Sequence, residues 1–113
     1  MRPGDSLKER MAVNGYLLNG YCAMPSPFAA EIYARQGWDT VTIDMEHGSI
    51  GFDGAVAILQ AISASGVVPL VRIPKVDAAT IGMLLDAGAL GITCAMINTA
   101  ARRMRDGFME ISS

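Results

Sequence analysis

The strongest constraint on the fold is a regular alternation of strand-like and helix-like segments along the chain. Four short segments are dominated by β-branched and other apolar residues, which is typical of buried strands: 15–22, 40–44, 67–73 and 91–96. Apolar residues recur at helical spacing in the three segments between them: 28–34, 52–65 and 78–87. The strands return about every 25 residues with short connections, which predicts βαβ units and a parallel sheet.

Local stop and start signals support these helix boundaries. Gly37, Gly66 and Gly88 follow the three helical segments, in the region where a glycine commonly ends a helix. Asp77 stands directly before the third segment, where its side chain is a suitable N-cap.

The two ends of the chain are less regular than the middle. We expect a short helix over residues 6–11, capped by Asp5 or Ser6, before the first strand. At the other end, Thr99 is expected to begin a fourth helix, and the pattern is lost over residues 102–110.

Four βα units correspond to half of a (β/α)8 barrel. The 113 residues fall well below the ~250 that a closed barrel usually needs. A small doubly wound sheet is the alternative, but no GxGxxG motif follows the first strand, so a dinucleotide site has no support. We therefore expect an α/β fold that forms the N-terminal half of a TIM barrel, as one truncated domain over residues 1–113.

Composition excludes several classes of protein. The chain is 51% apolar and 18% charged, which is unlike a disordered tail, and its net charge of -2 shows no basic excess for nucleic acid. No secretory signal and no apolar run long enough to span a membrane are present. Cys22 and Cys94 lie far apart and outside any CxxC spacing, so we expect two reduced core thiols and a cytoplasmic protein.

Protonatable side chains gather where the second strand ends. Asp44, Glu46 and His47 follow one another within five residues, and the carboxyl ends of barrel strands are where active sites lie. An imidazole beside a carboxylate can be held in one tautomer and act as a general base near neutral pH. The alternative is an ordinary polar loop in which Asp44 caps the next helix, and residue types alone leave both readings open.

Arg72 stands at the end of the otherwise apolar third strand. A buried guanidinium without a partner is very costly, so we expect a carboxylate beside it. Arg72 could hold a substrate carboxylate or enolate oxygen, or it could pair with Asp44 or Glu46 across adjacent strands.

Asp86 lies in the last turn of the third helical segment, where the helix dipole disfavours a negative charge. It is therefore expected to have a positive or hydrogen-bonding partner, for which His47 is a candidate. A solvated surface carboxylate is an equally good interpretation of this position.

Several of these segments together resemble one enzyme family. In order and spacing, the chain is similar to the first half of the HpcH/HpaI aldolase and citrate lyase family, over roughly residues 15–100. Within that family it looks most like the pyruvate-type class II aldolases, such as 2-keto-3-deoxy sugar acid aldolases and hydroxy-heptenedioate aldolase. The segments that carry the resemblance are 26–44, 44–48, 69–74, 85–89 and 96–100.

The resemblance implies a (β/α)8 barrel that cleaves a 4-hydroxy-2-oxo acid to pyruvate and an aldehyde with a divalent metal, Mg or Mn. Such a metal would stabilise the enolate without a lysine Schiff base. By match, His47 would be the acid/base group and Arg72 would hold the pyruvyl oxygens. Asp44 and Asp86 would orient His47, and Glu46 would lie near the metal-bound waters.

The sequence also departs from the family pattern. The family's two direct metal ligands, a glutamate and an aspartate, come from later strands, so no metal ligand is expected in this chain. Unpaired edge strands and an open inner face predict burial by self-association into a homo-oligomer. Two hypotheses follow: an aldolase whose site is incomplete in this chain, or a catalytically inactive half barrel that at most binds small carboxylates.

Overall fold

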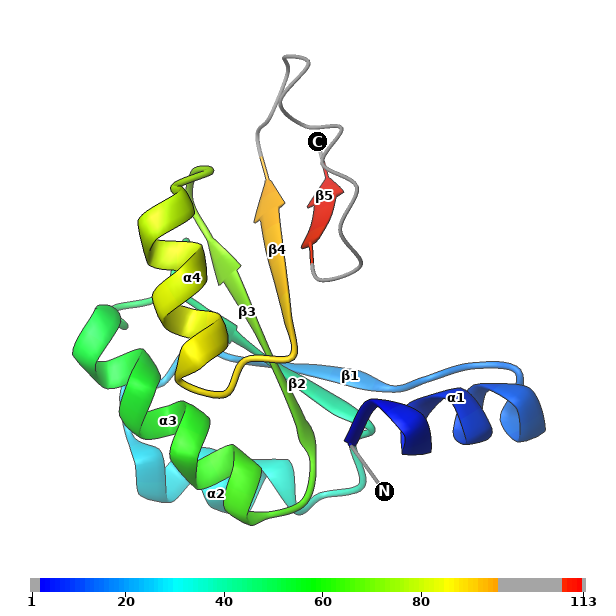
Figure 1. Cartoon of the computed structure of the whole chain (residues 1–113). Helices are drawn as coiled ribbons and strands as arrows, with labels where there is room; N and C mark the ends of the chain where they lie inside the picture. Colours follow the sequence, from blue (N-terminus) through cyan, green and yellow to red (C-terminus); the bar gives the residue numbers. More distant parts are fainter. Residues whose placement is uncertain (1–2, 96–108, 113) are drawn as a thin grey trace.

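The computed structural model describes the backbone of residues 3–95 and 109–112, and the side chains of residues 6–94. Strands and helices alternate through the middle of the chain, with an additional helix before the first strand (Figure 1). The elements are α1 Pro3–Asn14, β1 Asn19–Cys22, α2 Pro27–Ala34, β2 Thr40–Asp44, α3 Phe52–Ala64, β3 Val68–Ile73, α4 Ala78–Asp86, β4 Gly91–Ala95 and β5 Met109–Ser112.

The strands form one parallel sheet in the order β1-β2-β3-β4-β5. Strands adjacent in sequence are therefore adjacent in space, as successive βα units require. The register pairs Tyr21 with Thr42, Asp44 with Arg72, and Arg72 with Thr93. The predicted parallel α/β sheet is confirmed, and its carboxyl ends meet along a single edge.

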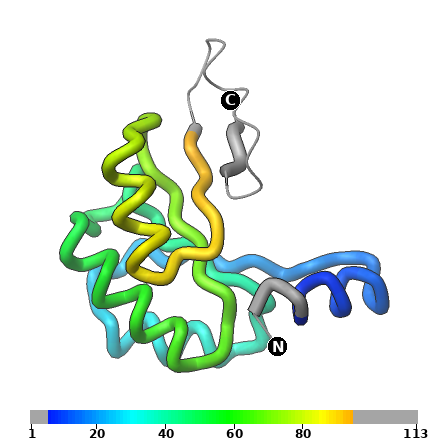
Figure 2. The backbone as a smooth tube through the Cα atoms, in the orientation of Figure 1, coloured from blue at the N-terminus to red at the C-terminus, as the bar shows by residue number. Residues whose placement is uncertain are grey.

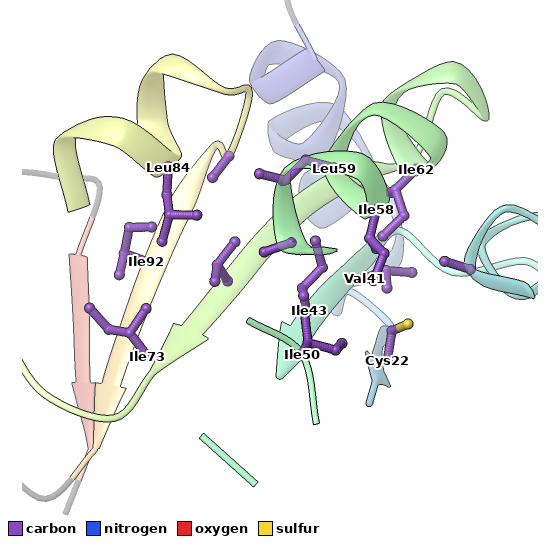
Figure 3. Close-up of a cluster of buried hydrophobic side chains, with 14 of the residues drawn as sticks. Cys22, Val41, Ile43, Ile50, Ile58, Leu59, Ile62, Ile73, Leu84 and Ile92 are labelled. Atoms are coloured by element: carbon purple, nitrogen blue, oxygen red, sulfur yellow. The ribbon is translucent and has the colours of Figure 1, made fainter. Parts of the chain in front are cut away.

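The hydrophobic core lies between the sheet and helices α2, α3 and α4, which cover one face (Figure 1). Alternate residues of the strands point to this face, and α3 contributes a stripe at helical spacing, as predicted. Figure 3 shows the side chains of this core between the strands and the helices. The fully buried members include Val41, Ile43, Ile58, Leu59, Ile62, Ile73, Leu84 and Ile92.

The opposite face of the sheet is more polar. Thr40 and Thr42 both donate hydrogen bonds to the side-chain oxygen of Asn19, at 2.7 and 2.9 Å. One pleat further along, at the carboxyl end, Asp44 and Arg72 face the same side because they are register partners. This face therefore carries the polar side chains that the sequence singled out.

The largest difference from the sequence-based expectation lies at the N-terminus. The first helix is longer than predicted and begins at Pro3, a residue favoured in the first turn, so neither Asp5 nor Ser6 is its cap. Gly15, with φ of 78°, follows the helix, and its N–H donates to the carbonyl of Met11. Figure 2 shows the tube of α1 lying apart from the other helices.

The first strand begins later than predicted, at Asn19 rather than at residue 15. The N–H of Leu18 donates to the Asp39 carboxylate at 2.7 Å instead of joining the ladder. β5 was not predicted, whereas the helix expected from Thr99 falls outside the described residues.

Two further expectations concern the core and the membrane. Cys22 and Cys94 are buried in the core, and burial raises the pKa of both thiols. In the part of the chain that the structure describes, no helix is long and apolar enough to cross a membrane.

Candidate functional site

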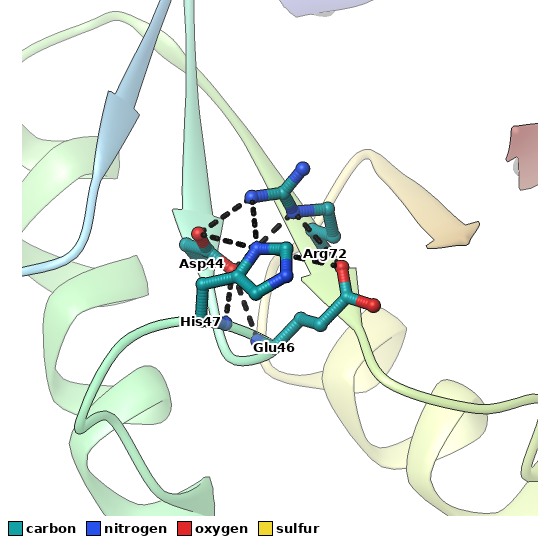
Figure 4. Close-up of polar contacts among 4 residues, drawn as sticks. All are labelled: Asp44, Glu46, His47 and Arg72. Atoms are coloured by element: carbon teal, nitrogen blue, oxygen red, sulfur yellow. Dashed lines mark hydrogen bonds and ion pairs between the residues drawn. The ribbon is translucent and has the colours of Figure 1, made fainter. Parts of the chain in front are cut away.

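Asp44, Glu46, His47 and Arg72 form one polar cluster at the carboxyl edge of the sheet (Figure 4). Asp44 is the last residue of β2, and Arg72 comes from β3 beside it. Glu46 and His47 stand on the loop that leaves β2 for α3. Adjacent parallel strands bring their ends together, so residues 28 positions apart meet here.

Asp44 organises the cluster through both carboxylate oxygens. Its Oδ1 accepts from the backbone N–H groups of Glu46 and His47, at 2.9 and 3.0 Å. Arg72 donates through Nε to Oδ1 at 3.3 Å and through Nη2 to Oδ2 at 2.6 Å. Only 7% of the Asp44 side chain is exposed. Asp44 thus shapes its own loop and does not cap α3, whose N-cap is Gly51.

The protonation state of this pair follows from these contacts. Burial raises the pKa of Asp44, but the hydrogen bonds from Arg72 and from the backbone of His47 and Glu46 outweigh it and lower this pKa to about 2. The hydrogen bond to Asp44 raises the pKa of Arg72. Both groups are therefore fully charged at neutral pH.

His47 is held in a defined state by the guanidinium. Its Nδ1 lies 3.0 Å from Nη2 of Arg72. A guanidinium has donors only, so Nδ1 must be the acceptor and the neutral ring carries its proton on Nε2. The His47 side chain is 67% exposed. In the neutral ring, the protonated nitrogen Nε2 is therefore turned away from Arg72.

Glu46 is the carboxylate with unused lone pairs. Its side chain is 9% exposed, and its buried Oε1 has no hydrogen-bond partner among the described residues. This oxygen lies 3.5 Å from Nε of Arg72 and 3.7 Å from Nδ1 of His47. Glu46 therefore forms a second, longer ion pair with Arg72, in which Oε1 accepts no hydrogen bond from the described residues.

The described residues do not fit a divalent metal by themselves. A group of three or more carboxylate, imidazole or thiol side chains that could hold an ion is absent from residues 6–94. The oxygens of Asp44 are already engaged by Arg72 and the loop backbone. Glu46 alone offers an oxygen, which is far short of a complete coordination sphere.

Arg72 retains donors that no described protein group uses. In the part of the chain that the structure describes, Nη1 has no hydrogen-bond acceptor, whereas Nε and Nη2 are engaged. The sequence left open whether Arg72 pairs with Asp44 or holds a ligand. The geometry allows both, because the ion pair uses one edge of the guanidinium and no residue within 6–94 engages the Nη1 amino group.

Tyr21 is a neighbour of the cluster that sequence reasoning missed. The guanidinium carbon of Arg72 lies 4.9 Å from the centre of the Tyr21 ring. The alternation of β1 could have indicated this residue, since Cys22 is buried among the helices and Tyr21 must point to the opposite face.

Gly48 permits the tight path of the loop. A Cβ atom at this position would lie 2.8 Å from the carbonyl oxygen of Asp44 and 3.1 Å from that of Ala23. These are backbone atoms that cannot easily move away. The backbone of Gly48 therefore packs directly on the strand end that carries the cluster.

The structure does not bring Asp86 to this cluster. Asp86 is exposed at the last residue of α4, and that helix runs back toward the start of the next strand. Leu90, four residues later, donates to the carbonyl of Pro69 near the start of β3. Asp86 therefore lies near the amino edge of the sheet, away from His47 of the same chain.

An apolar cavity of about 420 Å³ lies on the helix side of this strand edge. Met45 and Ile73 line it, and they alternate with Asp44 and Arg72 along the chain. The cavity contains none of the four cluster side chains. The polar cluster, which carries the charges and the imidazole, is therefore the better candidate site.

Comparison with known proteins agrees with this arrangement. The sequence model of the HpcH/HpaI aldolase/citrate lyase family matches residues 20–105. A hydroxypyruvate/pyruvate aldolase of Rhizorhabdus wittichii is 43% identical over 84 residues, covering 74% of this chain and 34% of that protein. A 4-hydroxy-2-oxovalerate aldolase of Novosphingobium aromaticivorans is 37% identical, covering 87% of this chain and 38% of that protein.

A solved structure shows the same arrangement of elements. The HpcH/HpaI aldolase/citrate lyase family protein from Burkholderia cenocepacia J2315 superposes with a TM-score of 0.70 at 34% identity. The match covers 83% of this chain and 38% of that one, so the fold is part of a TIM barrel. The chain spans about a third of the length of the curated relatives it matches. By family match and by structure, this chain is a member of the HpcH/HpaI aldolase/citrate lyase family.

Proposed function

We propose that this chain carries the pyruvyl-binding and proton-transfer part of a class II aldolase site. The proposed reaction cleaves a 4-hydroxy-2-oxo acid to pyruvate and an aldehyde. The observation that supports it most directly is the arrangement of Arg72: Asp44 engages its Nε–Nη2 edge, its Nη1 has no acceptor among the described residues, and His47 lies beside it.

Arg72 binds the oxygens of the substrate's pyruvyl group in this proposal. A guanidinium recognises a carboxylate or enolate oxygen through charge-assisted hydrogen bonds, and Nη1 has donors to offer. Asp44 holds the guanidinium in place before the substrate arrives, which reduces the entropy lost on binding.

His47 moves the proton in this proposal. In the cleavage direction the C4 hydroxyl gives its proton to Nδ1 of His47, the C3–C4 bond breaks, and its electron pair moves to the C2 oxygen as the enolate. The aldehyde leaves, and the imidazolium gives a proton to C3, which yields pyruvate and restores the ring. Nδ1 can take up the proton only when the exposed ring turns away from Arg72, whose Nη2 otherwise occupies this nitrogen. Asp44 orients the His47 loop, while a role for Asp86 would need a second copy of the chain, since Asp86 lies near the opposite edge.

A divalent metal, Mg²⁺ or Mn²⁺, belongs to the proposal on the basis of the family. It would stabilise the enolate oxygen when bound. The described residues do not supply its ligand set, so we assign it no ligand in this chain and place Glu46 only near metal-bound waters.

The substrate class, the assembly and the cellular setting are also part of the proposal. We propose a small oxo acid as the substrate, a homo-oligomeric assembly, and a cytoplasmic setting, which the two buried cysteine thiols favour.

Exchange of the pyruvate methyl protons with deuterated water, followed by NMR, tests the proposal. Exchange requires removal of a C3 proton to form the enolate. We expect exchange that depends on Mn²⁺ or Mg²⁺ and falls by at least tenfold in His47→Ala and Arg72→Lys. Because the His47 side chain is exposed, His47→Ala is expected to fold normally, so reduced exchange in this variant would not result from unfolding.

Arg35→Lys is the matched control for Arg72→Lys. Arg35 also forms an ion pair, at 3.0 Å with Glu31, but this pair lies on the surface of α2. Exchange equal in the wild type and His47→Ala would contradict the proposal and support the other hypothesis, a catalytically inactive half barrel.

A further inference from the structure

Three adjacent strands hold the guanidinium of Arg72 from different directions. Asp44 of β2 engages its Nε–Nη2 edge, and the Tyr21 ring of β1 lies 4.9 Å from its central carbon. Arg72 itself comes from β3 and therefore extends across β2 to reach Tyr21. The register makes this reach possible, since Tyr21 is level with Thr42, two residues before Asp44.

The two contacts restrict different motions of the guanidinium. Hydrogen bonds along one edge leave the plane free to hinge about that edge. An aromatic face beneath the plane opposes this hinge, because the cation is attracted to the ring centre. The direction of Nη1, which the hydrogen bonds to Asp44 leave available, depends on this tilt.

We propose that Tyr21 is a positioning residue that sets the tilt of Arg72 and so directs Nη1 toward the oxygens of a bound oxo acid. The ligand part of this inference rests on the proposed function, whereas the packing of Arg72 on Tyr21 does not. The ring face performs this role and the hydroxyl does not, since no hydrogen bond of the hydroxyl is found within residues 6–94.

The first test examines the chain without any ligand. A proton above an aromatic face is shielded, whereas the hydrogen bond from Nε to Asp44 deshields Arg72 Hε in the wild type and the variants alike, so the contribution of the ring is read from the difference between them. We expect the Arg72 Hε resonance to move downfield and to exchange faster with solvent in Tyr21→Leu, and to stay near its wild-type position in Tyr21→Phe. An Arg72 Hε resonance that is the same in the wild type and Tyr21→Leu would overturn the proposal.

The second test measures pyruvate binding in the presence of Mn²⁺. Tyr21→Leu is expected to weaken binding about threefold, the size of a partly exposed cation–π contact, and Tyr21→Phe is expected to leave it unchanged. Tyr16→Leu is the matched control, because Tyr16 is exposed to a similar degree and has no described contact with Arg72.

The two tests separate failure of this inference from failure of the proposed function. Equal pyruvate affinity in the wild type and Tyr21→Leu would overturn the positioning role. Absence of pyruvate binding in the wild type, with the Arg72 Hε resonance moved as expected in Tyr21→Leu, would overturn the oxo-acid function and leave the packing role of Tyr21 supported. Equal weakening in Tyr21→Phe and Tyr21→Leu would show that the hydroxyl matters and would contradict the inference.

Discussion

At the scale of single residues, Asp44 links charge, loop shape and stability. Its pKa is about 2 in the folded chain, compared with 3.8 for an unperturbed aspartate. Above about pH 5 the carboxylate is charged in both the folded and unfolded states, and its contacts stabilise the fold fully. As the pH falls from about 5 toward about 2, the unfolded state takes up a proton before the folded state does, so this stabilisation is progressively lost.

We therefore expect Asp44→Asn to lower the free energy of unfolding by about 1–2 kcal/mol at pH 6. The difference from the wild type should shrink between pH 4 and pH 2, as measured by urea denaturation at a series of pH values. Asp53→Asn is the control, because Asp53 is exposed in the first turn of α3. A difference that stays constant down to pH 2 would contradict the assigned pKa.

At the scale of elements, the loop between β2 and α3 decides where Glu46 and His47 lie. Gly48 packs on the backbone of Asp44 and Ala23, so an added Cβ has no room. We expect Gly48→Ala to destabilise the fold by about 1–3 kcal/mol and to displace His47 from Arg72, with loss of pyruvate methyl exchange. Urea denaturation and the exchange assay check both parts.

Gly54→Ala is the control for that prediction. Its added Cβ would lie 3.6 Å from Ile50, an ordinary contact, and Gly54 is within helix α3. Alanine is the better helix former, so we expect this variant to be more stable by up to about 1 kcal/mol and equally active. Equal behaviour of the two variants would mean that the loop does not depend on the close approach at Gly48.

At the scale of the whole molecule, exposed apolar side chains gather in residues 16–32. Six of the nine large exposed hydrophobic residues of the described chain belong to this stretch: Tyr16, Leu18, Tyr21, Met24, Phe28 and Ile32. β1 is also the first strand in the sheet order, so one of its edges has no neighbour among the described strands. Such an edge beside apolar side chains favours association.

We expect the 113-residue chain to self-associate through this stretch. Phe28 and Ile32 lie one turn apart on α2, so Phe28→Lys with Ile32→Lys should shift the mass measured by analytical ultracentrifugation toward the monomer. Met83→Lys, on α4, changes a comparably exposed residue elsewhere and should leave the mass unchanged. A monomeric wild-type chain would contradict the expectation.

Much of the fold could be predicted because its signals are local. The strand at 40–44 and the helix from Phe52 have the predicted bounds to within one residue, since each has a clear period and a clear stop. The start of the first strand was predicted too early, because residues 15–18 are as apolar as a strand. The N–H of Leu18 donates to the side chain of Asp39, 21 residues away, and is therefore not available for a hydrogen bond to a neighbouring strand.

The sequence by itself determined the order of strands and helices, and it indicated that Asp44, Glu46, His47 and Arg72 stand at strand ends, because periodicity and residue type act over a few neighbouring residues. Only the tertiary structure decided that Arg72 contacts both Asp44 and His47. It also placed the Tyr21 ring against the guanidinium of Arg72 and placed Asp86 away from this cluster. These outcomes depend on strand register and on the direction in which each helix runs back. Both arise from contacts between residues far apart in the chain.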